Sequence, residues 1–288
     1  MVGILKNQLK TVILLGVLSG LLLWVGQLIG GKSGLIIGLI FVLIMNFGSY
    51  WFSDKIVLMM YRAREVSKNE EPALHKAVEE VSKKAGIPKP SVYILPTNHS
   101  NAFATGRSPK HAAIACTKGI MELLTEKELN GVLAHEIAHI KNRDILITTV
   151  AATIAGVISF VGMIARWSSI FGGIGGSDRD DKGGNIISLI VLGIITPLIA
   201  MIVQLAISRS REYLADESGA GYISDPESLA SALEKIDADA HRHPLGFGSP
   251  ATSSLFISNP FKGGALLNLL STHPPTKERV KRLRERRV

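Results

Sequence analysis

The segment HEIAH carries two histidines and a glutamate at a spacing that suits a metal ion. His135 and His139 are four residues apart, so on a helix both imidazoles project from one face, and Glu136 directly follows the first histidine. In this pattern the histidines bind zinc, and the glutamate acts as general base toward a water molecule on the metal. Chance produces the pattern rarely in this chain, because only 8 of its 288 residues are histidine. The sequence therefore predicts a catalytic zinc site rather than two structural histidines.

A catalytic zinc also needs a third protein ligand and one open position. Glu212 is the favoured ligand, because it follows the last long apolar segment by four residues, much as His139 precedes an apolar segment by six. If those two segments cross a membrane and return, both residues lie within roughly 10 Å of the same membrane face. Asp216, one helical turn beyond Glu212, is suited to accept the N–H of a ligating histidine. Ordinary polar roles for both acids remain an alternative, as do other histidines as ligands. These histidines are His75, His99, His111, His241 and His243.

Four uncharged apolar segments are long enough to form membrane-spanning helices. They cover residues 11–31, 33–53, 145–165 and 183–208. A helix needs about 20 apolar residues to cross a hydrocarbon core about 30 Å thick. The first segment lacks the small-residue cleavage site of a signal peptide and is followed at once by the second, so we interpret it as a retained anchor. The alternative is a soluble protein that buries these segments as core helices.

Basic residues flank the apolar segments unevenly. Lysine and arginine gather before the first segment, between the second and third, and after the fourth, whereas the two other loops carry few or balanced charges. The positive-inside rule then places both termini and residues 54–144 in the cytoplasm. The net charge of +8 fits an anionic membrane surface, so we expect the lipid bilayer and no nucleic acid as a partner. The single cysteine, Cys116, excludes an intramolecular disulfide bond.

Between the apolar segments, the hydrophobic pattern predicts both helices and strands. Residues 70–86 form an amphipathic helix that ends at Gly86, and three short apolar stretches have the length of strands. These stretches are residues 91–95, 101–105 and 111–117. Thr125 and Glu128 form a capping box that begins a helix of about 16 to 18 residues. This helix carries HEIAH.

The predicted organisation alternates membrane and cytoplasmic parts. An N-terminal transmembrane hairpin (1–53) precedes the first part of a cytoplasmic domain (54–144), which contains the motif helix. A second transmembrane hairpin (145–208) precedes the second part of that domain (209–288), which contains the third ligand. The predicted fold class is therefore α+β, with a four-helix transmembrane part.

Four segments together resemble the HtpX-type membrane metalloproteases, which are related to the type I CAAX prenyl proteases. The segments are HEIAHIKNRD, SRSREYLADESGA, NAFATG and THPPTKER, and the similarity extends over essentially the whole chain. The resemblance implies a zincin-like metalloprotease domain that binds one Zn²⁺ per chain. It also implies that His135, His139 and Glu212 are the ligands and that Glu136 is the catalytic base. His241 and His243 match no motif of that family.

The same resemblance is the main ground for two further catalytic candidates. His273 and Arg279, in THPPTKER, are predicted to donate hydrogen bonds to the oxyanion of the transition state. The alternatives are a turn histidine and a surface arginine. The segment NAFAT, with Asn101, Ala102 and Phe103, is predicted to offer an exposed strand edge to an extended substrate. Recognition would then depend on unfolded chain rather than on one side chain.

Together these features predict an integral-membrane zinc endopeptidase. It would be a multi-pass protein of the plasma (inner) membrane, with its catalytic domain and both termini in the cytoplasm. The expected substrates are unfolded polypeptides and membrane proteins that are misfolded or damaged under stress. One alternative is a membrane protease of narrow specificity that processes a prenylated or precursor substrate. Another is a membrane scaffold with a structural metal, which the intact Glu136 disfavours.

Overall fold

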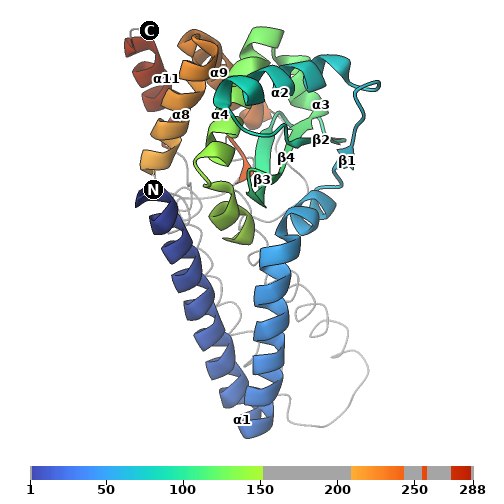
Figure 1. The fold of residues 1–288 in the computed structure, drawn as a ribbon, viewed down its shortest axis with the longest axis vertical. Coiled ribbons are helices and arrows are strands. Elements are labelled where there is room, and N and C mark those ends of the chain that lie inside the picture. The colour runs from blue at the N-terminus through green and yellow to red at the C-terminus, as the bar shows by residue number, and fades with distance from the viewer. Residues whose placement is uncertain (1, 152–208, 243–254, 258–273, 287–288) are drawn as a thin grey trace.

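The computed structural model describes residues 2–151, 209–242, 255–257 and 274–286 (Figure 1). The helices are α1 (Val2–Met60), α2 (Pro72–Ala85), α3 (Lys118–Leu123), α4 (Glu126–Lys141), α8 (Arg209–Ile223), α9 (Pro226–Arg242) and α11 (Thr276–Glu285). The strands are β1 (Arg64–Glu65), β2 (Ser91–Leu95), β3 (Ala102–Ser108) and β4 (His111–Thr117). The structure therefore has the mixed helix and strand content that the sequence predicts.

Helix α1 folds back on itself at Gly31 and forms a hairpin of two long arms (Figure 1). Gly31 has φ 55° and ψ −134°, outside the helical region, and glycine adopts these angles without a steric cost. The arms approach closely, because a Cβ atom on Gly34 would lie 2.0 Å from the carbonyl oxygen of Gly26. Asn46 of the second arm donates a hydrogen bond of 2.9 Å to the hydroxyl of Ser19 in the first. These contacts hold the two arms of the N-terminal hairpin together.

The second arm of α1 is long and apolar enough to cross a membrane. The stretch Gly31–Met60 has a mean hydropathy of 2.0, and it is the one such helix among the described residues. Ile37 and Ile44 on this arm are 68% and 66% exposed, which suits a hydrocarbon environment. The first arm contributes a shorter apolar stretch, Leu15–Trp24.

The helix does not end at residue 53, where the sequence predicts the end of the hairpin. It continues to Met60, because its last turns become part of the folded domain. Val57 and Tyr61 are buried there, and the ring of Tyr61 lies 5.4 Å from that of Phe256. Of the second predicted hairpin, residues 145–151 are helical, and 152–208 lie outside the described residues. The third and fourth crossings therefore stay predictions.

The four strands form one sheet in the order β1-β2-β4-β3. β2 and β4 are parallel, whereas β1 pairs with β2 and β3 pairs with β4 in antiparallel fashion. The strands predicted at 91–95 and 111–117 are confirmed, and the one predicted at 101–105 runs from Ala102 to Ser108. Strand β3 is at the edge of the sheet, beside α4 (Figure 1).

Both faces of the sheet are buried, which explains the nearly continuous apolar run of β4. Ile114 and Cys116 pack in the core that the sheet shares with α2 and α4. Ala113 and Ala115 face the opposite side and pack with the end of α1. This alternation follows from the two-residue period of a strand.

Helix α4 lies at the centre of the domain and packs against α2, α8, α9 and β3. The predicted capping box is present: Thr125 accepts the N–H of Glu128, and the carboxylate of Glu128 accepts the N–H of Thr125 at 2.9 Å. The same carboxylate accepts hydrogen bonds from Ser231 and Lys235 of α9, at 2.6 and 2.8 Å. Glu128 therefore begins the motif helix and also attaches α9 to it.

Helices α4 and α8 approach closely at a glycine. A Cβ atom on Gly219 would lie 2.8 Å from the backbone nitrogen of His135, closer than side chains normally lie. Gly219 is about two helical turns beyond Glu212 on α8. The small residue therefore sets the distance between Glu212 and the motif helix.

We expect Gly219→Ala to force the two helices apart. The added methyl group would collide with the backbone of α4, which cannot move aside as a flexible side chain can. The substitution should therefore lower the free energy of unfolding by about 1–3 kcal/mol. Thermal unfolding of the detergent-solubilised protein, followed by circular dichroism, measures the change. Gly221→Ala on the same helix is the matched control, because a Cβ atom there meets nothing within 4 Å. It should leave stability unchanged or raise it by up to about 1 kcal/mol. Equal effects of the two substitutions would contradict this account of the helix contact.

Candidate metal centre

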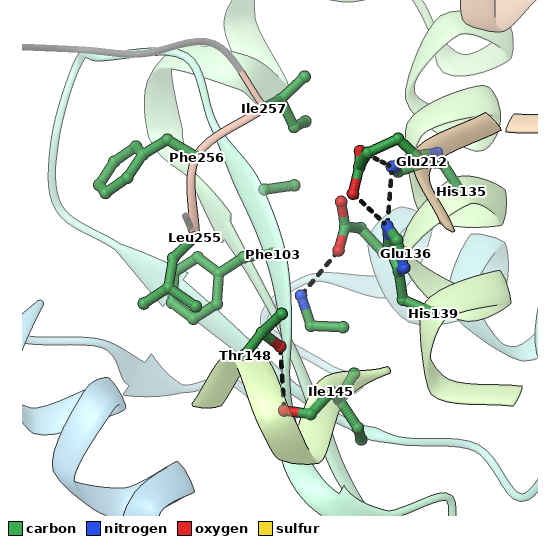
Figure 2. A pocket seen from close by; sticks show the side chains of 12 residues that line it. Phe103, His135, Glu136, His139, Ile145, Thr148, Glu212, Leu255, Phe256 and Ile257 are labelled. Atoms are coloured by element: carbon green, nitrogen blue, oxygen red, sulfur yellow. Dashed lines mark hydrogen bonds and ion pairs between the residues drawn. The ribbon is translucent and has the colours of Figure 1, made fainter. Parts of the chain in front are cut away.

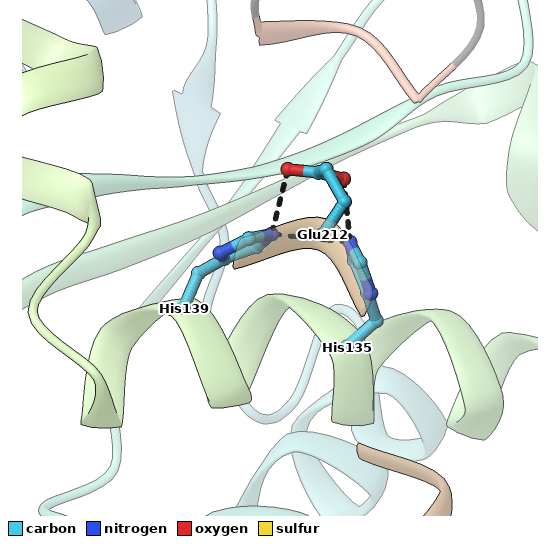
Figure 3. Close-up of side chains that lie close together, drawn as sticks. All are labelled: His135, His139 and Glu212. Carbon is cyan, nitrogen blue, oxygen red and sulfur yellow. Dashed lines mark hydrogen bonds and ion pairs between the residues drawn. The ribbon is translucent and has the colours of Figure 1, made fainter. Parts of the chain in front are cut away.

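Two imidazoles on consecutive turns of α4 point into the same space (Figure 3). The Nε2 atoms of His135 and His139 are 3.1 Å apart, and the ring centroids are 4.7 Å apart. His135 is buried, and the side chain of His139 is 14% exposed. The spacing of four residues therefore places both imidazoles on one face of the helix, as the sequence predicts.

Glu212 of α8 completes a group of three potential ligands (Figure 3). Its Oε2 atom lies 3.6 Å from Nε2 of His135, and its Oε1 atom lies 3.5 Å from Nε2 of His139. Ligands about 2.0–2.2 Å from a tetrahedral zinc are about 3.3–3.5 Å from one another. The three side chains thus have the separations and the donor types that a zinc ion requires.

The hydrogen bonds of the two histidines leave both Nε2 atoms directed at this point. Nδ1 of His135 lies 2.9 Å from Oδ1 of Asp216, and Nδ1 of His139 lies 3.2 Å from Oδ2 of Asp144. A neutral imidazole that donates from Nδ1 carries a lone pair on Nε2. Two such lone pairs at 3.1 Å repel each other unless a cation lies between them. The arrangement therefore favours a bound metal ion.

Of the two carboxylates that orient the histidines, the sequence analysis predicts one, Asp216, but not the other, Asp144. Asp216 lies where it is predicted, one turn beyond Glu212. Asp144 was missed, although it follows the motif closely in HIKNRD. It reaches back because Arg143 has φ 59° and the N–H of Asp144 bonds the carbonyl of His139 at 3.0 Å. A carboxylate shortly after each ligand is the signal that would have found it.

Arg279 of α11 lies behind His135 and not among the residues that line the pocket. It is 2% exposed, so it is not the surface arginine of the alternative interpretation. Its Nε and Nη2 atoms donate to the two carboxylate oxygens of Asp216, at 2.9 and 2.6 Å. Nη1 lies 3.9 Å from Oε2 of Glu212. Arg279 therefore fixes the carboxylate of Asp216, which in turn orients the ring of His135. The other oxyanion candidate, His273, lies outside the described residues.

Charge interactions shift the pKa values of this buried group. Burial works against the charged form of His135, but the carboxylates of Asp216 and Glu212 raise its pKa to about 9. Burial likewise works against ionised Asp216, but the guanidinium of Arg279 lowers its pKa to about 2. The pKa of His139 is also raised, mainly by Glu212 against the effect of burial. The centre thus attracts positive charge, either protons or a metal ion.

Glu136 faces the same pocket from α4 (Figure 2). Its Oε2 atom accepts a hydrogen bond of 2.8 Å from the backbone N–H of Ala104 in β3. This bond fixes the carboxylate between the edge strand and the metal ligands. The sequence did not predict the contribution of Ala104.

The predicted substrate strand is covered rather than exposed. Asn101, Ala102 and Phe103 are all buried. Ala102 packs in the core that contains α4, Phe103 packs with the end of α1 and with Phe256, and Asn101 bonds to Leu255 and Ile257. The N–H groups of Ala104 and Gly106 bond to Glu136 and to the hydroxyl of Thr149. The expectation of an open edge along these residues is therefore wrong. Ala102 and Phe103 nevertheless line the pocket of the metal centre.

A short segment from the C-terminal part of the chain forms the apolar wall of the pocket (Figure 2). It consists of Leu255, Phe256 and Ile257. The amide of Asn101 holds it: Nδ2 donates to the carbonyl of Leu255 at 3.1 Å, and Oδ1 accepts the N–H of Ile257 at 2.9 Å. Asn101 is thus a structural link in the pocket wall. Sequence patterns alone did not indicate this segment.

The other candidate histidines do not join the metal centre in the described part of the chain. The ring of His75 bonds the carbonyl of Val66 at 2.9 Å, and the ring of His99 lies 5.8 Å from that of Phe256. His111 lies at the start of β4. His241 is in the last turn of α9, whereas His243 lies outside the described residues.

Comparison with known proteins gives consistent results at the level of sequence and fold. A sequence model described as peptidase family M48 matches residues 68–287. A protein named "Protease HtpX homolog" from Syntrophobacter fumaroxidans is 50% identical over 278 residues, which cover 96% of this chain and 99% of that protein. Proteins of the same name from Persephonella marina and Pyrococcus furiosus are each 54% identical, over 97% and 96% of this chain and 97% and 94% of their own.

The fold is similar to that of a solved structure. The crystal structure of S. mikatae Ste24p superposes with a TM-score of 0.50 at 20% sequence identity. The match covers 98% of this chain but 66% of the length of that one. It supports the arrangement of the elements described above.

Replacing Glu212 with glutamine should remove most of the metal affinity. The substitution keeps the size of the side chain but removes the negative ligand, so zinc affinity should fall by at least about 100-fold. Zinc content after dialysis against metal-buffered solution measures this. Glu217→Gln is the matched control, because Glu217 is exposed on the same helix and pairs with Arg286 at 3.4 Å, away from the ligand group. Full zinc content in Glu212→Gln would contradict the ligand assignment.

Metal affinity should also depend on pH. The pKa of metal-free His135 is about 9, so at lower pH the ring is protonated and a metal ion must displace that proton. The dissociation constant should therefore rise about tenfold for each pH unit below this value, or about 100-fold from pH 8.5 to pH 6.5. Calorimetric titration with zinc in two buffers of different ionisation enthalpy counts the released protons. A zinc affinity that stays constant over this pH range would contradict the predicted displacement of a proton from His135.

Proposed function

The chain belongs to peptidase family M48, and on that premise we propose that it is a zinc-dependent endopeptidase of the membrane. The observation that carries the proposal is the position of Glu136, in one pocket with His135, His139 and Glu212. Hydrolysis requires a carboxylate that faces the metal pocket without being a ligand. A structural metal site has no need of such a residue.

His135, His139 and Glu212 would hold the zinc ion, which supplies a Lewis acid that acidifies water and polarises a peptide carbonyl. Among the described residues the ligand group has three members, so a fourth position is left for water or substrate. Glu136 accepts the proton of the attacking water and delivers it to the leaving amine. Its bond to Ala104 keeps the carboxylate oriented for both transfers.

The remaining residues of the centre act by positioning. Asp216 and Asp144 fix the imidazole rings, and Arg279 balances the charge of Asp216. Arg279 thus acts through Asp216 rather than on the substrate. His273 remains the proposed donor to the oxyanion, on the basis of its place in THPPTKER.

The substrate is proposed to be an extended polypeptide. Its backbone would lie in the pocket beside Glu136 and the ligand group, and an apolar side chain would contact Phe103 and Phe256 in the pocket wall. Folded proteins cannot present such a strand, so the enzyme would act on misfolded or damaged membrane proteins, as in quality control under stress. The apolar second arm of α1 supports a place in the membrane. The distribution of lysine and arginine supports a multi-pass topology with the domain in the cytoplasm.

Glu136→Gln should separate metal binding from catalysis. The three ligands stay intact, so zinc content should match the unmodified protein, whereas cleavage of casein should fall by at least about 100-fold. Glu126→Gln, in the exposed first turn of the same helix, is the control and should retain activity. Comparison of one membrane protein in folded and unfolded form tests the substrate class with the unmodified enzyme. Undiminished cleavage by Glu136→Gln would refute the proposed mechanism, and equal cleavage of both forms would refute the proposed substrate class.

A further inference from the structure

A second cavity lies where the second arm of α1 meets the adjoining ends of β3 and β4. Its apolar wall consists of Phe47, Trp51 and Phe52, which are 60%, 44% and 47% exposed. They lie at the end of the uncharged stretch of the arm, where aromatic residues of membrane proteins contact lipid headgroups. Arg107, near the end of β3, and His111, at the start of β4, also line the cavity.

The backbone of the turn directs Arg107 toward this aromatic cluster. The pairing of β3 with β4 shifts register between Gly106 and Ser108, so Arg107 lies in a bulge. Gly106 has φ 129°, and a Cβ atom there would lie 2.1 Å from the carbonyl oxygen of His111, so the bulge requires glycine. A bulge of this kind re-aims a side chain. The guanidinium carbon of Arg107 lies 4.6 Å from the ring centroid of Trp51.

Two cations and one carboxylate surround the aromatic wall. The ammonium group of Lys55 lies 6.0 Å from the ring centroid of Phe52, and Arg107 donates to the carbonyl of Trp51 at 3.4 Å. Asp54 is the one acid among the residues that line the cavity. A guanidinium over an indole ring keeps donors that can bind an oxyanion. The cavity therefore combines an excess of positive charge with an apolar surface.

We propose that this cavity binds the headgroup of an anionic phospholipid. The inference rests on the proposed place of α1 in the membrane. The lipid phosphate would accept hydrogen bonds from Arg107 and Lys55, and the start of the acyl chains would lie against Phe47 and Trp51. Because Arg107 is on β3, the bound lipid would fix the height of this strand, and of the pocket that it lines, above the membrane.

Trp51 is a native probe of this site. The double variant Trp24→Phe, Trp167→Phe leaves it as the sole tryptophan of the full-length protein, which has three. The protein is reconstituted in phosphatidylcholine bilayers that contain either brominated phosphatidylglycerol or brominated phosphatidylcholine. The brominated anionic lipid should quench Trp51 fluorescence at a lower mole fraction than the zwitterionic one.

Arg107→Gln should reduce this preference about fivefold, the contribution of one cation near a lipid surface. Arg107→Lys should retain most of it. Lys110→Gln is the matched control, because it removes the same charge from the exposed tip of the same turn, outside the cavity lining. Unchanged zinc content shows that each variant is folded.

Three results would overturn the lipid site. These are the absence of any preference, an equal loss in Arg107→Gln and Lys110→Gln, and displacement of the lipid by millimolar inorganic phosphate. The second result would indicate diffuse surface charge, and the third a site for free phosphate. Failure of both brominated lipids to quench Trp51 would instead contradict the membrane location in the proposed function.

Discussion

The close approach of helices α4 and α8 is the constraint on which the metal centre depends. His135 and His139 are brought together by the helix itself, but Glu212 comes from a distant part of the chain. Its distance from the histidines is set where Gly219 lies against the backbone of His135. The same contact brings Asp216 to the ring of His135. Ligand geometry and histidine orientation therefore have one common cause, a helix contact that tolerates no side chain.

Burial of charge explains why this contact requires further residues. Glu136, Glu212 and Asp216 are all buried close to one another, and isolated buried carboxylates are very costly. Arg279 compensates one of them through its two bonds to Asp216. A divalent cation at the point that the ligands surround would match the remaining negative charge. The domain is thus complementary to a metal ion in charge as well as in geometry, and the raised pKa of His135 reflects the same excess of carboxylates.

What the sequence could predict was governed by local rules. The capping box at Thr125 and the four-residue histidine spacing are short-range features, so helix α4 and its ligand face were predictable. Glu212 was predicted from its position relative to the apolar segments and from the resemblance to the HtpX-type metalloproteases. Asp144, by contrast, depends on the left-handed turn at Arg143, and the buried position of Arg279 depends on how α11 packs. Which helix covers a strand edge is likewise a tertiary property, and so the burial of β3 could not be read from its alternating pattern.

Strand β3 links the two proposed activities of the domain. Near its start Ala104 bonds Glu136, the proposed catalytic base, and near its end Arg107 contacts the aromatic wall at the proposed lipid site. At about 3.3 Å per residue these positions are roughly 10 Å apart along the strand. In the proposed topology the apolar segment that begins six residues after His139 crosses the membrane, and His139 then lies within roughly 10 Å of the bilayer. A peptide would then leave the bilayer by about two helical turns before it reaches Glu136. A helix loses its backbone hydrogen bonds over that distance only if it is already unstable, which is a physical reason for the proposed preference for damaged over intact membrane proteins.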